Sequence, residues 1–295
     1  SSANLALGTL AIVTGPDRIL LTSSSSQFKS GTCQTLTVTT KDTAGATHPV
    51  LANKTIGFDN GGGSGVFYSD NLCTVVSSQA AMSAGASTTT AYYKDLRGEA
   101  VVITAADGAG SLNSGTLSFA SGPDRLSISA NSSFKSGTCQ SITVVSRDTS
   151  DFATAAFADT LIDLDDGPAS GVFFSDNTCA TTITQTTLLG TTSSKGVYYK
   201  NGIAETITLV AADNAASLIT GTLTVTAGPD HIIMSGNASF KSGTCQTITI
   251  TTEDTSNALK AVLSNTTINL TDANAGGTYY SNNVCTASIT QTVLL

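Results

Sequence analysis

The sequence predicts an all-β protein made of antiparallel two-sheet β-sandwich modules in tandem, and three observations lead to this prediction. The heptapeptide FKSGTCQ occurs at Phe28–Gln34, Phe134–Gln140 and Phe240–Gln246, at intervals of 106 residues. Each copy's cysteine is followed by a second cysteine 40 residues later. Short alternating segments separated by turn residues run through each repeat, without a helical period of useful length. A fixed period of this size is typical of repeated domains, each large enough to bury its own core.

The early strands of a module can be read from the first repeat. Asp17–Thr22 is expected to open it, directly after a Gly-Pro turn. Cys33–Thr40 alternates, with Leu36 and Val38 on one face and threonines on the other, which favours a strand over a helix. Cys33 is odd-numbered whereas Leu36 and Val38 are even-numbered, so in a regular strand the Cys33 side chain points away from the core face. Its bridge is therefore expected to tie the start of the strand to a neighbouring loop. Shorter strands are expected at Lys54–Phe58, Val66–Tyr68 and Val75–Gln79.

A β-hairpin is expected late in modules 1 and 2. In the second repeat, Tyr198–Lys200 and Glu205–Val210 flank Asn201 and Gly202, which would supply the positive φ angles of a type I′ turn. Adjacent aromatic residues point to opposite faces of a strand, so one residue of each aromatic pair is expected in the core.

The six cysteines predict one disulfide in each module. The expected pairs are Cys33 with Cys73, Cys139 with Cys179, and Cys245 with Cys285. Each bridge would close a loop of 40 residues, which the chain-entropy model rates at roughly 4 kcal/mol. The alternative is a bridge across a junction, from Cys73 to Cys139, but three equal spacings favour pairing within modules. A zinc site is not expected, because there is no CxxC and the sequence has two histidines, His48 and His231.

The repeat is out of phase with the ends of the sequence. Gly8–Arg18 matches Gly115–Arg125, a segment that closes one module and leads into the next, and Leu295 corresponds to Leu189. The sequence also begins at Ser1 without Met, so we expect a processed or excised form of a longer precursor. The expected parts are 1–14 as the closing strand of a preceding module or a donor strand, 15–121 as module 1, 122–227 as module 2, and 228–295 as an incomplete module 3.

Two hypotheses explain these termini. The sequence is either a window cut from a longer repeat protein, or a subunit that polymerises head to tail by donating Leu5–Thr14 to the third module of another subunit. Because one donated strand cannot replace three missing strands, the window is favoured. The modules are expected to meet at very short junctions, and short junctions suppress bending. The predicted junction residues are Gly15, Pro16, Gly122, Pro123, Gly228 and Pro229.

Composition excludes several classes of function. Charged residues make up 12% of the chain and the net charge is −8, which argues against a nucleic-acid partner. A hydrophobic content of 40% argues against disorder. No apolar run reaches the roughly 18 residues of a membrane span. Six cysteines at equal spacings favour an oxidising compartment.

Candidate sites for chemistry are few. Asp163, Asp165 and Asp166 offer carboxylates in one loop, the ligand type that calcium prefers, but ordinary turn chemistry is the favoured explanation and any calcium affinity is expected to be weak. No other cofactor is expected. Neither His48 nor His231 recurs in the other modules, and no GxSxG, HExxH or phosphate-binding loop is present. The sequence therefore does not predict an enzyme.

Several motifs together resemble a known family. These are Gly-Pro-Asp followed by a strand, SGTCQ followed by alternating apolar residues and threonine, GVFYSDNLC and GVFFSDNTC, and the closing GTL strand. They resemble the bacterial immunoglobulin-like repeats, of the invasin and adhesin kind, found in large secreted surface proteins. This resemblance implies immunoglobulin-like sandwiches, a location outside the cell or on the bacterial surface, and no enzymatic activity.

The function expected from the repeats and the resemblance is a rigid extracellular stalk or fibre. Its partners would be copies of itself or further modules of the same chain. The alternative is an adhesin that binds a glycan or a cell-surface receptor through the variable segments Thr43–Gly63, Thr149–Pro168 and Thr255–Ala275.

Overall fold

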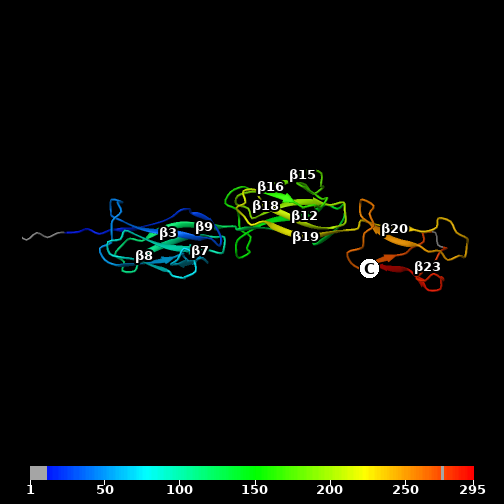
Figure 1. The fold of residues 1–295 in the computed structure, drawn as a ribbon, viewed down its shortest axis with the longest axis horizontal. Coiled ribbons are helices and arrows are strands. Elements are labelled where there is room, and N and C mark those ends of the chain that lie inside the picture. Colours follow the sequence, from blue (N-terminus) through cyan, green and yellow to red (C-terminus); the bar gives the residue numbers. More distant parts are fainter. Residues whose placement is uncertain (1–11, 274–275) are drawn as a thin grey trace, which may run out of the picture. The chain divides into compact units, whose positions relative to one another are not determined.

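Every regular element that the structure describes is a β-strand. The computed structural model describes residues 12–273 and 276–295, and it confirms the all-β prediction (Figure 1). Most of the predicted closing or donor strand, residues 1–11, lies outside the described residues, and Ile12–Thr14 has no regular structure. In this described part of the chain no helix is present that could cross a membrane.

The chain forms two compact units. One contains the described residues up to Asp124 together with Arg147–Phe157, and the other contains Arg125–Ser146 together with Ala158–Leu295. A short segment of the second repeat, Arg147–Phe157, is thus part of the first unit. Modules 1, 2 and 3 are named below by their ranges in the sequence, and those boundaries stay a prediction.

Module 1 is a sandwich of two sheets. The strand order is β1-β3-β7-β5 in one sheet and β2-β9-β8-β4-β6 in the other. Neighbouring strands are antiparallel except for β2 and β9, which pair in parallel. The strands are β1 (Arg18–Ser23), β2 (Gln27–Lys29), β3 (Cys33–Lys41), β4 (Lys54–Asp59), β5 (Val66–Tyr68), β6 (Gln79–Met82), β7 (Thr88–Lys94), β8 (Ala100–Asp107) and β9 (Gly115–Gly122).

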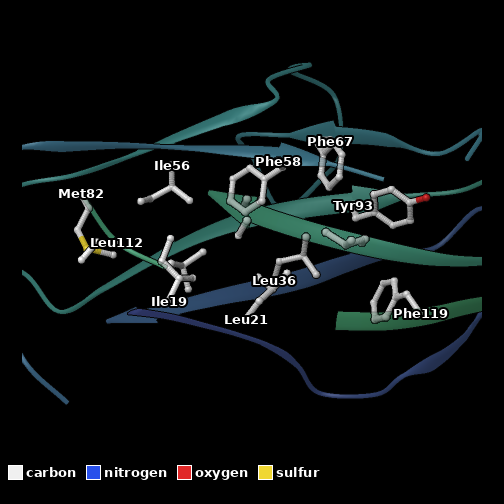
Figure 2. Packing of buried hydrophobic residues seen from close by; sticks show 14 of the residues in the cluster. Ile19, Leu21, Leu36, Ile56, Phe58, Phe67, Met82, Tyr93, Leu112 and Phe119 are labelled. Carbon is white, nitrogen blue, oxygen red and sulfur yellow. The ribbon is translucent and has the colours of Figure 1, made fainter. Parts of the chain in front are cut away.

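The core of module 1 lies between these sheets. On β3, Leu36 and Val38 are fully buried while Thr35, Thr37 and Thr39 are not, as the alternation predicted. Figure 2 shows apolar side chains from both sheets pointing toward one another. Tyr93 of β7 lies at the centre of an aromatic cluster, with ring centroids 5.0 Å from Phe67 and 5.9 Å from Phe119. These contacts bury the large rings that dominate the energetics of a small core.

Module 2 repeats this topology. Its sheets have the orders β10-β12-β17-β14-β15 and β11-β19-β18-β13-β16, and β11 is again parallel to β19. The strands are β10 (Arg125–Ser129), β11 (Ser133–Lys135), β12 (Gln140–Arg147), β13 (Thr160–Asp165), β14 (Val172–Phe174), β15 (Thr182–Ile183), β16 (Gln185–Leu188), β17 (Ser194–Lys200), β18 (Thr206–Asp213) and β19 (Gly221–Gly228).

The described part of module 3 forms three strand pairs. They are β20 (His231–Ser235) with β21 (Thr249–Glu253), β22 (Thr266–Asn269) with β25 (Gln291–Leu294), and β23 (Tyr279–Tyr280) with β24 (Ser288–Ile289). This sequence holds no counterparts of β17, β18 and β19 for module 3. Phe240 is 62% exposed, whereas its equivalents Phe28 and Phe134 are 7% and 9% exposed.

Two predictions of local structure are wrong. The strand expected at Val75–Gln79 is instead β6 at Gln79–Met82, and Val76 forms an isolated bridge to Tyr68. The expected hairpin is not one, because β17 and β18 lie in different sheets and neither Asn201 nor Gly202 has a positive φ. The segment between β17 and β18 crosses from one sheet to the other. Turn residues such as Asn and Gly occur in connections of this kind as well as in hairpins, so they do not distinguish the two.

The burial of equivalent isoleucines gives a testable difference. Ile142 of module 2 is 1% exposed and Ile248, its equivalent in module 3, is 46% exposed. We expect Ile142→Ala to destabilise module 2 by about 2–5 kcal/mol, because it leaves a cavity, and Ile248→Ala to cost less than about 1 kcal/mol. Both changes in the free energy of unfolding can be measured by urea unfolding, monitored through hydrogen exchange of β12 and β21. Equal losses of stability in the two variants would contradict this account of the core.

Candidate functional site at the ends of the modules

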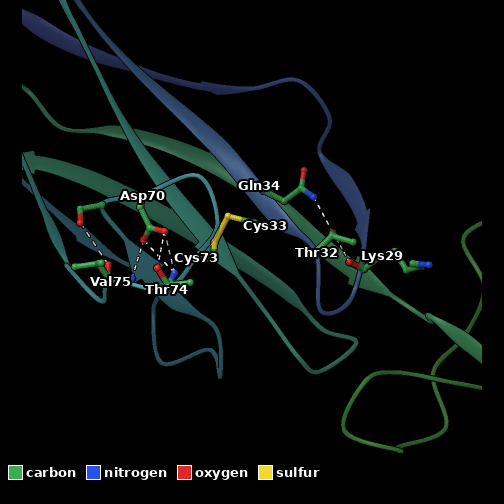
Figure 3. The surroundings of a disulfide bond; sticks show 9 residues. Lys29, Thr32, Cys33, Gln34, Asp70, Cys73, Thr74 and Val75 are labelled. Atoms are coloured by element: carbon green, nitrogen blue, oxygen red, sulfur yellow. Dashed lines mark hydrogen bonds between the residues drawn. A yellow bond between two sulfur atoms is a disulfide. The ribbon is translucent and has the colours of Figure 1, made fainter.

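The disulfides join a strand to a loop within each module. Cys33 begins β3 and bonds to Cys73 in the loop after β5, with 5.8 Å between their Cα atoms (Figure 3). The bridges of Cys139 with Cys179 and of Cys245 with Cys285 have the same separation of 40 residues. The alternative bridge from Cys73 to Cys139 is therefore not formed. As the parity of Cys33 indicated, the bridge lies at the edge of the core.

The loop at the second cysteine has an unusual backbone. Cys73, Cys179 and Cys285 have φ angles of 53°, 51° and 53°, in the left-handed region that non-glycine residues seldom adopt. In module 1 the carboxylate of Asp70 accepts hydrogen bonds from Val75 N at 2.7 Å and Thr74 N at 3.0 Å, and these hold the turn closed (Figure 3). The hydrogen bond from Val75 N is the largest cause of the lowered pKa of Asp70.

Module 3 has an amide in place of this carboxylate. Asp176 of module 2 accepts hydrogen bonds from Thr178 Oγ1 and Thr181 N, and these lower its pKa. In module 3 the same position is Asn282, which accepts a hydrogen bond from Thr286 N at 3.0 Å. The turn therefore titrates with acid in modules 1 and 2 but not in module 3.

This difference predicts a pH effect with an internal control. Because the folded pKa values of Asp70 and Asp176 are lowered, the ionised side chains stabilise their turns above about pH 4 and lose this effect as the pH falls through the folded pKa. We expect the amide proton shifts of Val75 and Thr181 to titrate below about pH 4 and that of Thr286 to stay constant. An NMR pH titration checks this, and a matching shift at Thr286 would contradict it.

The repeated heptapeptide forms a turn just before the first cysteine. Thr32 donates to the Lys29 carbonyl through both N, at 3.2 Å, and Oγ1, at 2.6 Å, and Gln34 Nε2 donates to Thr32 Oγ1 at 2.8 Å (Figure 3). Gly31 has a φ of 80°, so the turn requires glycine. The turn leaves the Ser30 hydroxyl and the Gly31 backbone at one end of module 1.

Residues of Arg147–Phe157 contact this turn within the first unit. Thr149 N donates to Ser30 Oγ at 3.0 Å, and the two hydroxyl oxygens lie 3.1 Å apart. A Cβ atom on Gly31 would lie 2.6 Å from Thr149 Oγ1, so glycine is also needed for the contact itself. Ser30 is 2% exposed as a result.

Asp148 forms the second part of the same contact. Its side chain is 1% exposed, and its Oδ2 accepts a hydrogen bond from Gly98 N at 2.8 Å. Its Oδ1 accepts from Phe152 N at 2.9 Å, which shapes the loop itself. The Arg97 guanidinium lies 4.0 Å from the centre of the Phe152 ring, a cation–π distance. The contact thus combines a charge-assisted hydrogen bond with aromatic packing.

The second unit contains an equivalent contact 106 residues further on. Asp254, fully buried, accepts a hydrogen bond from Ala204 N at 3.1 Å. Thr255 Oγ1 donates to the Gly202 carbonyl at 2.5 Å, and a Cβ atom on Gly137 would lie 2.6 Å from Thr255 Cγ2. Lys260 Nζ adds a hydrogen bond to the Ala204 carbonyl at 2.8 Å. The aspartate with its backbone donor and the glycine beside the threonine are therefore used twice, whereas Thr255 bonds to Gly202 and not to Ser136, the counterpart of Ser30.

The predicted junction residues lie beside these contacts. The Gly122 carbonyl accepts a hydrogen bond from Ser30 N at 3.0 Å, and the Gly228 carbonyl accepts one from Ser136 N at 2.9 Å. A Cβ atom on Gly122 would lie 2.4 Å from the Phe157 ring. Gly122 and Gly228 are the last residues of β9 and β19, so both junctions are continuous with a strand. Pro123 is buried, whereas Pro229, Gly15 and Pro16 are half-buried.

The calcium candidates do not converge. Asp163 accepts hydrogen bonds from Gln185 Nε2 and Asn214 Nδ2 on the face of β13. Asp165 accepts from Gly167 N, and Asp166 accepts from Gly171 N and from Tyr199 OH, so each carboxylate has partners of its own. Within residues 12–273 and 276–295, no group of three or more His, Cys, Asp or Glu side chains could hold a metal ion.

Sequence reasoning missed the role of the Asp-Thr pair. Asp42-Thr43, Asp148-Thr149 and Asp254-Thr255 occupy the same place in the three repeats. That recurrence was the available signal, but it lies at the start of segments that otherwise vary. The partners, Gly98 and Ala204, share no side-chain chemistry, because the contact uses their backbone N–H groups.

Comparisons with known proteins give structural matches alone. No protein-family model and no curated protein matches the chain. The Escherichia coli adhesin FdeC is 14% identical with a TM-score of 0.40, and the match covers 96% of this chain and 90% of that one. Modules 1 and 2 have the two facing sheets of an immunoglobulin-like sandwich. This assignment rests on the two sheets of each of these modules and on the apolar core that lies between them.

Two other structural matches are also bacterial adhesion proteins. The Yersinia pseudotuberculosis adhesin InvE is 18% identical with a TM-score of 0.30, over 71% of this chain and 58% of that one. Invasin, a bacterial integrin-binding protein, is 13% identical with a TM-score of 0.32, over 86% of this chain and 50% of that one. Glycosidases match as well, but the match covers 25% of the Bacteroides vulgatus β-glycosidase chain.

Proposed function

We propose that this chain is a structural segment of an extracellular stalk or fibre, in which immunoglobulin-like modules follow one another through short, fixed junctions. The observation that carries this proposal is the contact between the Ser-Gly turn and the Asp-Thr loop, which occurs in both units. A flexible tether would not need buried Asp148 and Asp254 side chains at matching positions. The three equal disulfides and the acidic, sparsely charged composition support a location outside the cell.

The contacts are suited to limiting motion at the junctions. A hydrogen bond to a charged group contributes about 1.5–3 kcal/mol, and the loops of Asp148 and Asp254 each make one such bond together with a threonine contact. Gly31 and Gly137 let backbone and side chain approach more closely than any larger residue would allow. Tension along the chain would also meet a disulfide in each module, which keeps the enclosed loop from extending.

The alternative of a ligand-binding adhesin loses part of its proposed surface. Two of the variable segments begin at Thr149 and Thr255, and in both the first residues contact the Ser-Gly turn or the loop beside it. Their side chains are therefore committed to the junction. A glycan or receptor site would have to lie elsewhere on the modules, and no described feature of the chain favours one.

Asp148 and Asp42 provide a matched pair for testing the proposal. Both carboxylates accept a hydrogen bond within their own loop, from Phe152 N at 2.9 Å and from Ala46 N at 2.8 Å, but Asp148 also accepts one from Gly98 N. We expect Asp148→Ala to broaden the motion between modules 1 and 2, and Asp42→Ala to leave it unchanged in dilute solution.

Single-molecule energy transfer between dyes on modules 1 and 2 measures this motion. The proposal predicts a narrow distance distribution for the wild type and for Asp42→Ala, and a broad one for Asp148→Ala. A wild-type distribution as broad as that of Asp148→Ala would show that the junction is a free hinge, and the stalk proposal would then be abandoned.

A further inference from the structure

The loop that connects β7 to β8 places two carboxyl groups at one hydroxyl group. Ser64 Oγ lies 3.0 Å from Asp95 Oδ1 and 2.7 Å from Glu99 Oε1. Asp95 is 1% exposed, and its side chain also lies within hydrogen-bonding reach of Glu99. Because the Ser64 hydroxyl carries a single proton, it cannot donate to both carboxyl groups at once. A second proton, held between the carboxyl groups, would satisfy both.

Module 2 has an amide at the position of Asp95. Asn201 Oδ1 accepts a hydrogen bond from Ile203 N at 2.8 Å. Asp95 Oδ1 accepts the equivalent bond from Arg97 N at 2.9 Å. The other side-chain atom of the amide, Asn201 Nδ2, donates to Glu205 Oε1 at 2.8 Å. By this equivalence Asp95 Oδ2 stands in the place of a donor, and a carboxyl oxygen donates only when it carries a proton.

The aspartate of module 2 lies elsewhere in the same polar network. Tyr199 OH donates to Asp166 Oδ2 at 2.7 Å, and the counterpart of Asp166 in module 1 is Asn60. In module 1 Tyr93 OH donates to Asp95 Oδ2 at 3.3 Å. Each of these two modules thus has one aspartate and one asparagine around a buried tyrosine, with their positions exchanged. The exchange puts the aspartate in the amide's place beside the glutamate in module 1.

The same loop forms the junction contact of the first unit. Gly98 N donates to Asp148 Oδ2 at 2.8 Å, and Gly31 N of the Ser-Gly turn donates to the Asp95 carbonyl at 2.6 Å. Glu99 N is bonded to Ser121 Oγ of β9 at 3.2 Å. Residues 95–99 therefore contain both the carboxyl pair and the backbone groups that contact Asp148 and Gly31. A change in the charge of the pair acts within the segment that makes the contact.

The surroundings favour a proton on Asp95. Burial raises the pKa of Asp95, and the negative charge of Glu99 raises it further. Burial also raises the pKa of Tyr93, so its hydroxyl stays neutral. The other titratable or charged groups on the elements that face the pair are Arg97 of the same loop, Lys29 of the Ser-Gly turn and Asp148. Asn60 and Ser64, which precede β5, are uncharged.

We propose that a proton shared by Asp95 and Glu99 makes the junction contact of the first unit sensitive to pH. With the proton bound, the two carboxyl groups are joined by a hydrogen bond. When the proton passes to solvent, two adjacent negative charges repel each other and residues 95–99 loosen their hold on Asp148. The inference rests on the proposed function, because this contact is the one that fixes the junction.

The direction of the effect follows from the raised pKa. The protonated form of Asp95 stabilises the folded loop fully below the unfolded pKa of about 3.9, and this stabilisation is lost as the pH rises through the folded pKa. The contact of the second unit does not share this response, because Asn201 supplies its donor at every pH.

Hydrogen exchange of two backbone amides in the full chain tests the proposal. Gly98 N–H and Ala204 N–H make equivalent bonds to Asp148 and Asp254. Between about pH 4.5 and about pH 8 we expect the protection factor of Gly98 to fall severalfold relative to that of Ala204. The same pH dependence at both amides would overturn the proposal.

Reciprocal variants exchange the two kinds of loop. Asp95→Asn should keep Gly98 protected at both pH values, because the new amide can donate to Glu99 as Asn201 donates to Glu205. Asn201→Asp should make the protection of Ala204 fall severalfold as the pH rises. A pH dependence of Gly98 that persists in Asp95→Asn would show that another group titrates, and the assignment to this pair would be wrong.

The same measurement separates this inference from the proposed function. If Gly98 and Ala204 are both protected and neither protection factor changes with pH, the proton switch is wrong and the stalk proposal stands. If neither amide is protected at either pH, the contacts with Asp148 and Asp254 are absent in solution and both proposals fall.

Discussion

The hydrogen-bonded turn at Lys29–Thr32 is the constraint on which the other features of module 1 depend. It places Phe28 in the core on one side and Cys33 at the start of β3 on the other, three positions from buried Leu36. The same turn presents a serine hydroxyl and a glycine backbone to Thr149 of the next repeat. One short segment therefore links the packing of the sandwich, the position of the disulfide and the contact with the next repeat.

This dependence explains why the seven residues are identical in all three repeats while their surroundings differ. Phenylalanine fills the core, glycine adopts a left-handed φ, threonine closes the turn, and glutamine bonds back to threonine. A substitution at any of these positions removes a different interaction. The loops that follow the Asp-Thr pair have fewer such demands, since much of their bonding uses backbone atoms.

The fold could be predicted from the sequence because its signals are local. Alternation along β3 and the equal cysteine spacing depend on residues close in sequence or repeated at a fixed interval. The error at Asn201-Gly202 arose where two strands adjacent in sequence belong to different sheets, which is decided by the packing of the whole module. The junction contact was missed for a related reason, because Gly98 and Ala204 contribute a backbone N–H group that any residue except proline carries.

Each repeat carries the loop at one of its ends and the matching turn at the other. Duplication of a whole repeat unit in the gene would therefore create a working joint on both sides of the inserted copy without a single new substitution. The length of such a protein can change by recombination alone, while the buried aspartate of every joint is retained.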